Sequence, residues 1–189
     1  MDLPPIILAS ASPRRAELMR QLSVHYSVVP SDAAEMHDDQ LTAREVSQLN
    51  AYRKARAVAK KHPDALVLGA DTLVYLGTKL FGKPADEEDA YRMLKELSGK
   101  THEVVTAVCL LQLRTHRQKL FYESTAVTFR ELDTTQIRRY LKRVHTLDKA
   151  GAYAIQEDGD LIVQGISGSY TNVVGLPVER LRQELGVWT

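Results

Sequence analysis

The sequence predicts an α/β protein whose sheet mixes parallel and antiparallel strands. Helical and strand patterns alternate along most of the chain, which is typical of an α/β fold. Two long β-rich runs, residues 101–113 and 120–129, are joined by a polar turn and predict an antiparallel pair. With 189 residues and 44% hydrophobic content, the chain is long enough for one well-buried domain. We therefore expect a single domain over residues 1–189, with two lobes sharing one sheet as the alternative.

Local start and stop signals predict the individual elements. Short apolar or β-rich runs predict the remaining strands, at residues 6–9, 25–29, 65–70 and 161–166. Capping side chains predict where helices begin, namely Ser12, Thr42 with Glu45, Asp86 with Asp89, and Asp133. Other residues mark turns and boundaries, namely Pro63 after a helix that reaches about His62, the hairpin turn Gly77-Thr78, the helix end at Ser98-Gly99, and Pro177 at the start of a terminal helix.

Composition narrows the class of protein without naming its function. The formal net charge is +1, so no global basic field favours duplex nucleic acid, and we expect no stable nucleic-acid complex. The single cysteine, Cys109, excludes an internal disulfide and suits a reducing compartment. The N-terminus lacks the basic segment and long apolar run of a signal peptide, and no stretch is long enough to span a bilayer. We therefore expect a soluble, cytoplasmic protein with no membrane partner.

The strongest chemical signal lies where the first strand runs into the first helix. The apolar run 6–9 is followed by Ser10-Ala11-Ser12-Pro13-Arg14-Arg15. Ser12 fits the N-cap position and Pro13 the first helical position, where a missing N–H costs nothing. The amides of the helix start, the serine hydroxyls and both guanidinium groups would then converge on one point. This segment predicts a phosphate site; the alternative is a capped amphipathic helix with solvated arginines.

A second signal places a carboxylate where a buried strand is expected to end. Asp71 follows the apolar run 65–70, at the edge of an α/β sheet where ligands meet side chains. The alternative is an aspartate that only forms a turn. Lys83 follows the expected hairpin, in the tight turn Gly82-Lys83-Pro84. An acidic metal ligand and a phosphate-binding lysine on either side of one hairpin would form a compact triphosphate site.

Residues 77–84 nearly match the phosphate loop G-x-x-x-x-G-K-[ST]. However, Pro84 stands where a hydroxyl should hold magnesium, and it disfavours helical angles at Lys83, where the helix should begin. We therefore exclude a P-loop ATPase or kinase.

Several ordered motifs together resemble the Maf family of nucleoside triphosphate pyrophosphatases, the septum-formation-inhibitor-like group. Each motif is weak alone, but their order and spacing are highly specific. The motifs run nearly end to end, as Leu8-Ala9-Ser10-Ala11-Ser12-Pro13-Arg14-Arg15, Arg53-Lys54-Ala55, Gly69-Ala70-Asp71-Thr72, Gly82-Lys83-Pro84, Leu97-Ser98-Gly99, Asp148-Lys149-Ala150-Gly151-Ala152-Tyr153-Ala154-Ile155-Gln156 and Val174-Gly175-Leu176-Pro177.

The resemblance implies a fold and an activity. The fold would be mixed α/β, with an elongated sheet flanked by helices around a central cleft, related to the house-cleaning pyrophosphatases that act on inosine triphosphate. The reaction would cleave nucleoside triphosphates between the α and β phosphates, giving a nucleoside monophosphate and pyrophosphate. Homodimers are common in such families, so a homodimer is one expected assembly. The family's septum-inhibitor name leaves open a nucleotide-sensing regulator of cell division that acts through a protein partner.

Matched residue by residue, the resemblance also assigns roles. Asp71 would be the central acid, as a metal ligand or as the general base on the attacking water, and Glu35 the second carboxylate and metal ligand. Residues 30–40 predict a polar, acidic loop, and the family usually has two adjacent acids in it, but the first of them is Ala34 here. All-oxygen ligation suits magnesium or manganese, and the six histidines form no spaced ligand pair. The residues that would hold the triphosphate are Ser10, Ser12, Arg14, Arg15, Lys54 and Lys83.

The substrate base is implied by a narrower resemblance. The double arginine after Pro13, Lys54 and the run Tyr153–Gln156 resemble the branch that hydrolyses dTTP and UTP, with Gln156 reading the base. The alternatives are N7-methyl-GTP or a modified nucleotide. Glu157-Asp158 departs from that branch, which usually has glycine after the glutamine, and we expect Glu157 to point away from the nucleotide. Without the family context, Gln156 reads as a polar residue at the end of a short strand.

Other chemically suggestive residues are expected to play structural parts. Cys109 lies in an apolar run and is expected to be a buried small hydrophobe rather than a nucleophile. Tyr153 and Tyr170 are expected to pack, as tyrosines in β-rich segments do. Four basic residues of one predicted helix are expected on a solvated face, namely Arg138, Arg139, Lys142 and Arg143.

Overall fold

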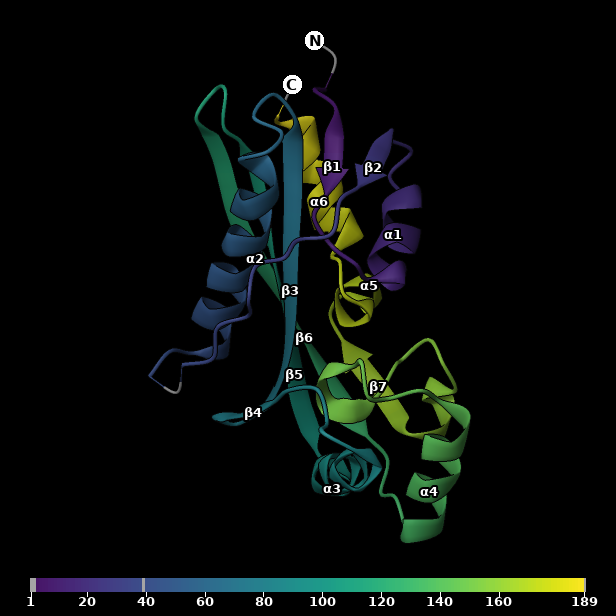
Figure 1. Cartoon of the computed structure of the whole chain (residues 1–189). Coiled ribbons are helices and arrows are strands. Elements are labelled where there is room, and N and C mark those ends of the chain that lie inside the picture. The colour runs from purple at the N-terminus through teal and green to yellow at the C-terminus, as the bar shows by residue number, and fades with distance from the viewer. Residues whose placement is uncertain (1–2, 39, 189) are drawn as a thin grey trace. The chain divides into compact units, whose positions relative to one another are not determined.

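The computed structural model describes residues 3–38 and 40–188 and shows a mixed α/β fold (Figure 1). Among these residues, seven strands form one sheet in the order β2-β1-β3-β5-β6-β7, with β4 paired to β3. The β1 strand pairs in parallel with β2 and β3, whereas β3 pairs antiparallel with β4, and β6 with β7. The predicted mixed sheet is confirmed. The strands are β1 (Ile6–Leu8), β2 (Tyr26–Val28), β3 (Leu66–Leu76), β4 (Lys79–Phe81), β5 (Thr101–Gln112), β6 (Arg117–Phe129) and β7 (Val163–Ser167).

The helices begin where the capping residues predict. Ser12, Thr42, Asp86 and Asp133 each accept a hydrogen bond from a backbone N–H in the first turn, which satisfies a donor that the helix itself cannot. The α2 helix ends at Ala59, close to the predicted end at about His62, and turn-type backbone hydrogen bonds continue as far as His62, just before Pro63. The helices are α1 (Pro13–Arg20), α2 (Ala43–Ala59), α3 (Glu87–Leu97), α4 (Thr134–Arg143), α5 (Tyr170–Val174) and α6 (Val178–Gly186), with two 3₁₀ turns, η1 (Ala150–Ala152) and η2 (Gly159–Leu161).

One strand boundary was predicted wrongly. The β3 strand does not end at Asp71 but continues through Leu76, so Asp71 lies inside a strand. The residues that follow Asp71 include Thr72, Val74 and Tyr75, which are β-branched or aromatic and favour a strand. Pairing of Val74 with Phe81 of β4 also extends the strand. Asp71 therefore does not form a turn, which removes the alternative that it serves only as a turn former.

The chain divides into two compact units, each with its own core. Unit 1 comprises Met1–Asp71, Thr106–Glu123 and Gly175–Thr189, and unit 2 comprises Thr72–Val105 and Ser124–Val174. The core of unit 1 contains small side chains from α2, among them Ala51 and Ala55, packed with residues of β1, β3 and β5. The core of unit 2 is richer in aromatic residues, including Phe129, Tyr140 and Tyr153. The single-domain organisation stays a prediction.

Most of the residues that were expected to play structural parts lie where the sequence predicted. Cys109 is fully buried, and burial raises its pKa to about 12, so the thiol stays protonated and is a poor nucleophile at neutral pH. Tyr153 is buried against Phe129, as expected. Tyr170, by contrast, lies in the unpredicted helix α5 and is 46% exposed, so its expected packing in a β-rich segment is wrong. The α4 basic residues are exposed, as predicted.

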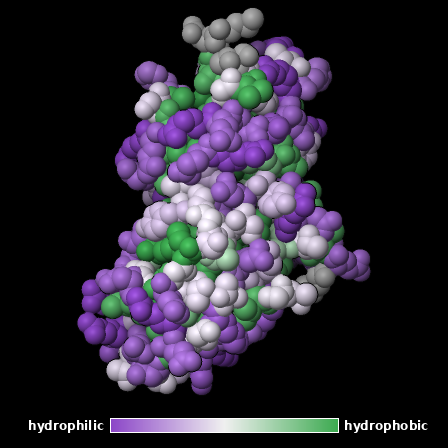
Figure 2. Space-filling view, turned by 180° about the vertical axis from the view of Figure 1, so that it is seen from behind, coloured by the Kyte–Doolittle hydropathy of each residue, from purple (hydrophilic) through white to green (hydrophobic). Residues whose placement is uncertain are grey.

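The surface is mixed in character. On the face drawn in Figure 2, hydrophilic residues are interspersed with small hydrophobic areas. Over residues 3–38 and 40–188, no helix combines the length and the apolar content that a membrane span requires.

Candidate active site

A glycine in β3 lets helix α2 pack directly against the strand in unit 1 (Figure 1). A Cβ atom at Gly69 would lie 2.3 Å from the carbonyl oxygen of Ala51 and 2.6 Å from the nitrogen of Ala55. Residues two apart in a strand point to the same face, so Asp71 shares the face of Gly69. Asn50 and Lys54 are one turn apart on α2 and so are neighbours on the helix surface. The close approach therefore brings both of them to Asp71.

Lys54 joins two carboxylates. Its Nζ donates to Asp71 Oδ1 at 2.6 Å and to Glu35 Oε1 at 2.8 Å. The side chains of Asp71 and Lys54 are only 6% and 13% exposed, so solvent screens this ion pair weakly. Glu35, on the loop before α2, is more exposed. The structure thus brings together three residues that the sequence assigned separately to catalysis, metal binding and phosphate binding.

Asn50 is a member of this network that the sequence analysis missed. Its side-chain amide donates to Asp71 Oδ2 at 3.3 Å and to the carbonyl oxygen of Met36 at 3.1 Å, and its carbonyl accepts the Met36 N–H at 2.8 Å. A signal was present, because Asn50 stands four residues from the buried Val46 and therefore on the buried side of α2. A polar side chain buried there requires partners.

The start of α1 supplies hydroxyl and guanidinium groups. Ser12 Oγ accepts the N–H of Arg15 at 3.5 Å, as expected of an N-cap, and Ser10 Oγ accepts the N–H of Ser12 at 3.2 Å. The Arg15 side chain turns back over this segment, donating to Ser10 Oγ at 3.4 Å and to the carbonyl oxygen of Gly175 at 2.8 Å. A hydroxyl that accepts such bonds keeps its own proton to donate to a ligand oxygen.

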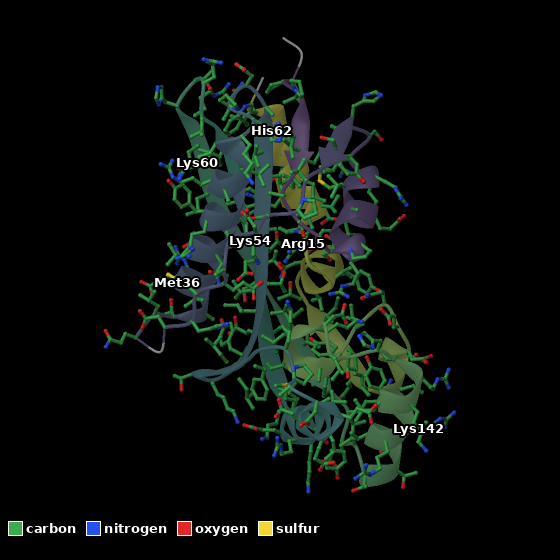
Figure 3. All side chains as sticks on the ribbon, viewed as in Figure 1. Arg15, Met36, Lys54, Lys60, His62 and Lys142 are labelled. Atoms are coloured by element: carbon green, nitrogen blue, oxygen red, sulfur yellow. The ribbon has the colours of Figure 1, made fainter. Side chains whose placement is uncertain are left out.

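Arg15 is also linked electrostatically to the acids. Burial lowers the pKa of Arg15, and the positive charge of the neighbouring Arg14 lowers it further. The negative charges of Asp71 and Glu35 act in the opposite direction and raise it. Guanidinium remains charged at any physiological pH, so Arg15 is a permanent cation near both carboxylates. Figure 3 labels Lys54 on α2 and Arg15 on α1, the two cations that reach the Asp71 region of β3 from different helices.

The carboxylate pair fits a hard divalent cation. Within the described part of the chain, no group of three or more His, Cys, Asp or Glu side chains could hold a metal ion. Magnesium does not need such a group, because proteins commonly bind it through one or two carboxylates, with water and substrate phosphates as its other ligands. Asp71 and Glu35, which share one Lys54 nitrogen, form this smaller set of oxygen donors. The donor set therefore suits magnesium or manganese.

The other two predicted substrate residues lie in unit 2. Lys83 is exposed after β4, and the next helix, α3, begins only at Glu87. The helix start that a phosphate loop requires at Lys83 is therefore absent, as predicted for residues 77–84. Gln156 is exposed in a turn between η1 and η2, so the alternative of a strand end is wrong. The Gly151 N–H donates to the carbonyl oxygen of Gly82 at 3.0 Å, which joins the segments that carry Lys83 and Gln156.

Sequence comparison identifies the family. The Maf-like protein family matches residues 5–187. The chain belongs to this family. A relative from Ruminiclostridium cellulolyticum named dTTP/UTP pyrophosphatase is 47% identical, with 93% of this chain and 92% of the relative covered. A relative of the same name from Akkermansia muciniphila is 46% identical, with the same shares covered.

Structure comparison supports the fold. The Ham1 protein of Staphylococcus aureus matches with a TM-score of 0.59 over 98% of this chain and 100% of Ham1, at 15% identity. At this identity the likeness shows the fold alone.

The structure shows the contacts made at two positions where this Maf-like chain departs from the expected motif. In the acidic loop, the residue that reaches Lys54 is Glu35, one position after Ala34. In unit 2, the Glu157 carboxylate lies 3.6 Å from the Lys149 ammonium and accepts a hydrogen bond from the Gln156 amide at 3.4 Å.

The second acid of that departure is also paired. Asp158 forms a two-point ion pair with Arg143, at 2.6 and 2.9 Å. Asp158 has a φ of 52°, which aspartate tolerates better than most residues. The negative charges of Glu157 and Asp158 are thus both compensated within unit 2.

Proposed function

We propose that this Maf-like protein hydrolyses nucleoside triphosphates between the α and β phosphates, and that dTTP and UTP are its substrates. The observation that carries the proposal is the buried Asp71 carboxylate, held by Lys54 and Asn50 beside a second acid, Glu35. The names of the two relatives, which match more than nine-tenths of this chain, support the choice of substrates. The acids favour hydrolysis over a nucleotide sensor, because a sensor needs only the cations that bind phosphate.

The proposed chemistry assigns each residue a task. Asp71 accepts the proton of the attacking water while the water oxygen bonds to phosphorus and the bond between the α phosphate and the bridging oxygen breaks. Asp71 and Glu35 would also hold a magnesium or manganese ion, which would neutralise phosphate charge when bound. The cations that would stabilise the triphosphate and the pyrophosphate leaving group are Arg14, Arg15, Lys54 and Lys83, with hydrogen bonds from Ser10 and Ser12.

The direct test is pyrophosphate release from a panel of nucleotides in the presence of magnesium. The panel contains dTTP, UTP, the remaining ordinary triphosphates, N7-methyl-GTP and modified pyrimidine triphosphates. We expect the specificity constants of dTTP and UTP to exceed those of the purine nucleotides. Release of no pyrophosphate from any member would overturn the activity, and a preference for N7-methyl-GTP would overturn the substrate assignment.

Substitutions of phosphate-binding residues and of the base-binding residue should change kcat/KM in different ways. We expect Arg14→Ala and Lys83→Ala to lower kcat/KM for every triphosphate by a similar factor, because phosphate contacts carry no information about the base. Gln156→Ala should instead change the ranking of bases, since a site that hydrogen-bonds a substrate group discriminates against analogues without that group. The measurement is kcat/KM over the same panel. A uniform loss in Gln156→Ala would remove Gln156 as the residue that reads the base.

The acid after Gln156 should not read the nucleotide. We expect Glu157→Gly to leave dTTP and UTP ahead of the purines, because Glu157 already faces Lys149 at 3.6 Å. Lys149 retains Asp148 at 2.9 Å and the His145 carbonyl as partners in this variant. The panel of specificity constants again gives the measurement. If wild-type protein preferred guanine nucleotides and Glu157→Gly abolished that preference, Glu157 would be a base contact instead.

Assembly, location and other partners stay predictions. The family resemblance makes a homodimer one expected assembly. Sequence composition predicts a cytoplasmic location and no stable nucleic-acid complex.

A further inference from the structure

A buried asparagine on α2 connects two separate parts of the candidate site. Asn50 is 1% exposed. Its amide nitrogen donates to Asp71 Oδ2 on β3 and to the Met36 carbonyl oxygen on the acidic loop, and its amide oxygen accepts the Met36 N–H. One side chain thus contacts the central acid and the residue next to Glu35.

These three hydrogen bonds determine which way the amide points. An asparagine amide has one acceptor oxygen and one donor nitrogen. Turned over, it would present its nitrogen to the Met36 N–H and its oxygen to both the Met36 carbonyl and the Asp71 carboxylate, so all three contacts would be lost. The contact with Met36 also resembles a strand pair, because it satisfies the N–H and the carbonyl oxygen of the same residue.

The segment that carries Glu35 has no regular backbone structure. Residues 29–38 contain no helix and no strand, so no backbone ladder holds Glu35 in place. The Glu35 side chain reaches Lys54, but it is 39% exposed, and an exposed ion pair restrains a side chain weakly. Fixing both backbone groups of Met36 restrains the adjacent residue from the buried side.

We propose that Asn50 is a positioning residue that holds the Glu35 loop segment beside Asp71, so that the two carboxylates are arranged together before a metal ion binds. The proposal rests on the proposed function for its effect on turnover. The Asn50 amide is hydrogen-bonded to Asp71 and to Met36, so in this proposal it acts through Asp71 and through the segment next to Glu35. Outer-shell partners of this kind typically change metal affinity by about 10–100-fold when they are removed.

The test uses two substitutions and a matched control on the same helix. Asn50→Ala removes all three hydrogen bonds, and Asn50→Leu removes them while filling the volume. Ser47→Ala is the control, since Ser47 is also buried on α2 but donates to Arg44 within the helix. Thermal melting of all three variants checks that the fold is retained.

Three readouts separate positioning from a general loss of structure. Hydrogen–deuterium exchange of the peptide that contains Met36 should become faster in both Asn50 variants. Mn²⁺ affinity, measured by electron paramagnetic resonance without nucleotide, should fall about 10–100-fold. The Mg²⁺ concentration for half-maximal activity should rise by a similar factor, while the KM for dTTP at saturating Mg²⁺ stays close to that of the wild type. Ser47→Ala should match the wild type in all of them.

The possible outcomes are distinct. Faster exchange with unchanged Mn²⁺ affinity would overturn the proposal, because Asn50 would then anchor the loop without arranging the acids. Unchanged exchange in both variants would overturn it as well. If the wild-type protein released no pyrophosphate from any nucleotide, the proposed function would fail, but faster exchange with weaker Mn²⁺ binding would still support the positioning role.

Discussion

Replacing Asp71 with asparagine is expected to lower the kcat of pyrophosphate release by at least about two orders of magnitude, the lower end of the effect of a general acid or base. The amide keeps the shape of the carboxylate but cannot accept a proton from water, and it is a weaker metal ligand. The KM should stay the same or fall, because the substitution removes a negative charge near the proposed triphosphate site. Steady-state pyrophosphate release with dTTP and Mg²⁺ provides the measurement.

The fold should survive this change. Removing one partner of a buried ion pair is usually costly because it leaves the other charge unpaired. Lys54, however, retains Glu35 at 2.8 Å, so its ammonium does not lose all of its countercharge. A thermal melt and a circular dichroism spectrum close to those of the wild type are therefore expected.

A matched control makes the same chemical change elsewhere. Asp64→Asn removes a carboxylate that pairs with Arg114 at 2.7 Å on the surface of unit 1. Both partners are well exposed, so this pair contributes little, and turnover should stay near that of the wild type. Near-normal turnover in Asp71→Asn would remove Asp71 from the mechanism, and an equal loss in Asp64→Asn would point to a non-specific effect.

The parts of the fold that could be predicted are those with local causes. Each predicted N-cap is correct, because a capping side chain satisfies donors within its own first turn. The predicted end of β3 at Asp71 was wrong, because a buried aspartate inside a strand looks in the sequence like the end of that strand. Asp71 lies inside the strand, where its buried carboxylate accepts hydrogen bonds from Lys54 and Asn50 of α2.

The candidate site shows the same division. Individual candidates such as Lys54 and Glu35 could be named from their motifs, but their shared contact could not. It joins Lys54 on α2 to a residue 19 positions earlier, in a segment, residues 29–38, that contains no helix and no strand. Asn50 was missed because its role depends on the backbone of Met36, and sequence pattern does not show which backbone groups lack partners. The turn at Gln156 and the helix α5 are both short, and short elements carry weak periodicity.

Substitution of Gly69 by alanine is expected to damage both stability and activity. The new Cβ would lie 2.3 Å from the Ala51 carbonyl oxygen, which is backbone and cannot move aside as a side-chain end could. Overpacking of this kind costs about 1–3 kcal/mol, which corresponds to a fall in Tm of roughly 2–12 °C for a chain of this size. Relief requires α2 to move away from β3, and that movement lengthens the contacts of Lys54 and Asn50 with Asp71.

The effect of Gly69→Ala on activity tests whether the packing of α2 on β3 sets the geometry around Asp71. At a temperature where the variant is still folded, its kcat should remain below that of the wild type, because the acid has lost its aligned partners. Gly165→Ala is the matched control, since Gly165 also lies in a strand and a Cβ there meets nothing within 4 Å. Equal melting temperature and kcat in Gly69→Ala and wild type would show that α2 does not need this close approach. A lower Tm with unchanged kcat would mean that the packing of α2 on β3 stabilises the fold without setting the geometry around Asp71.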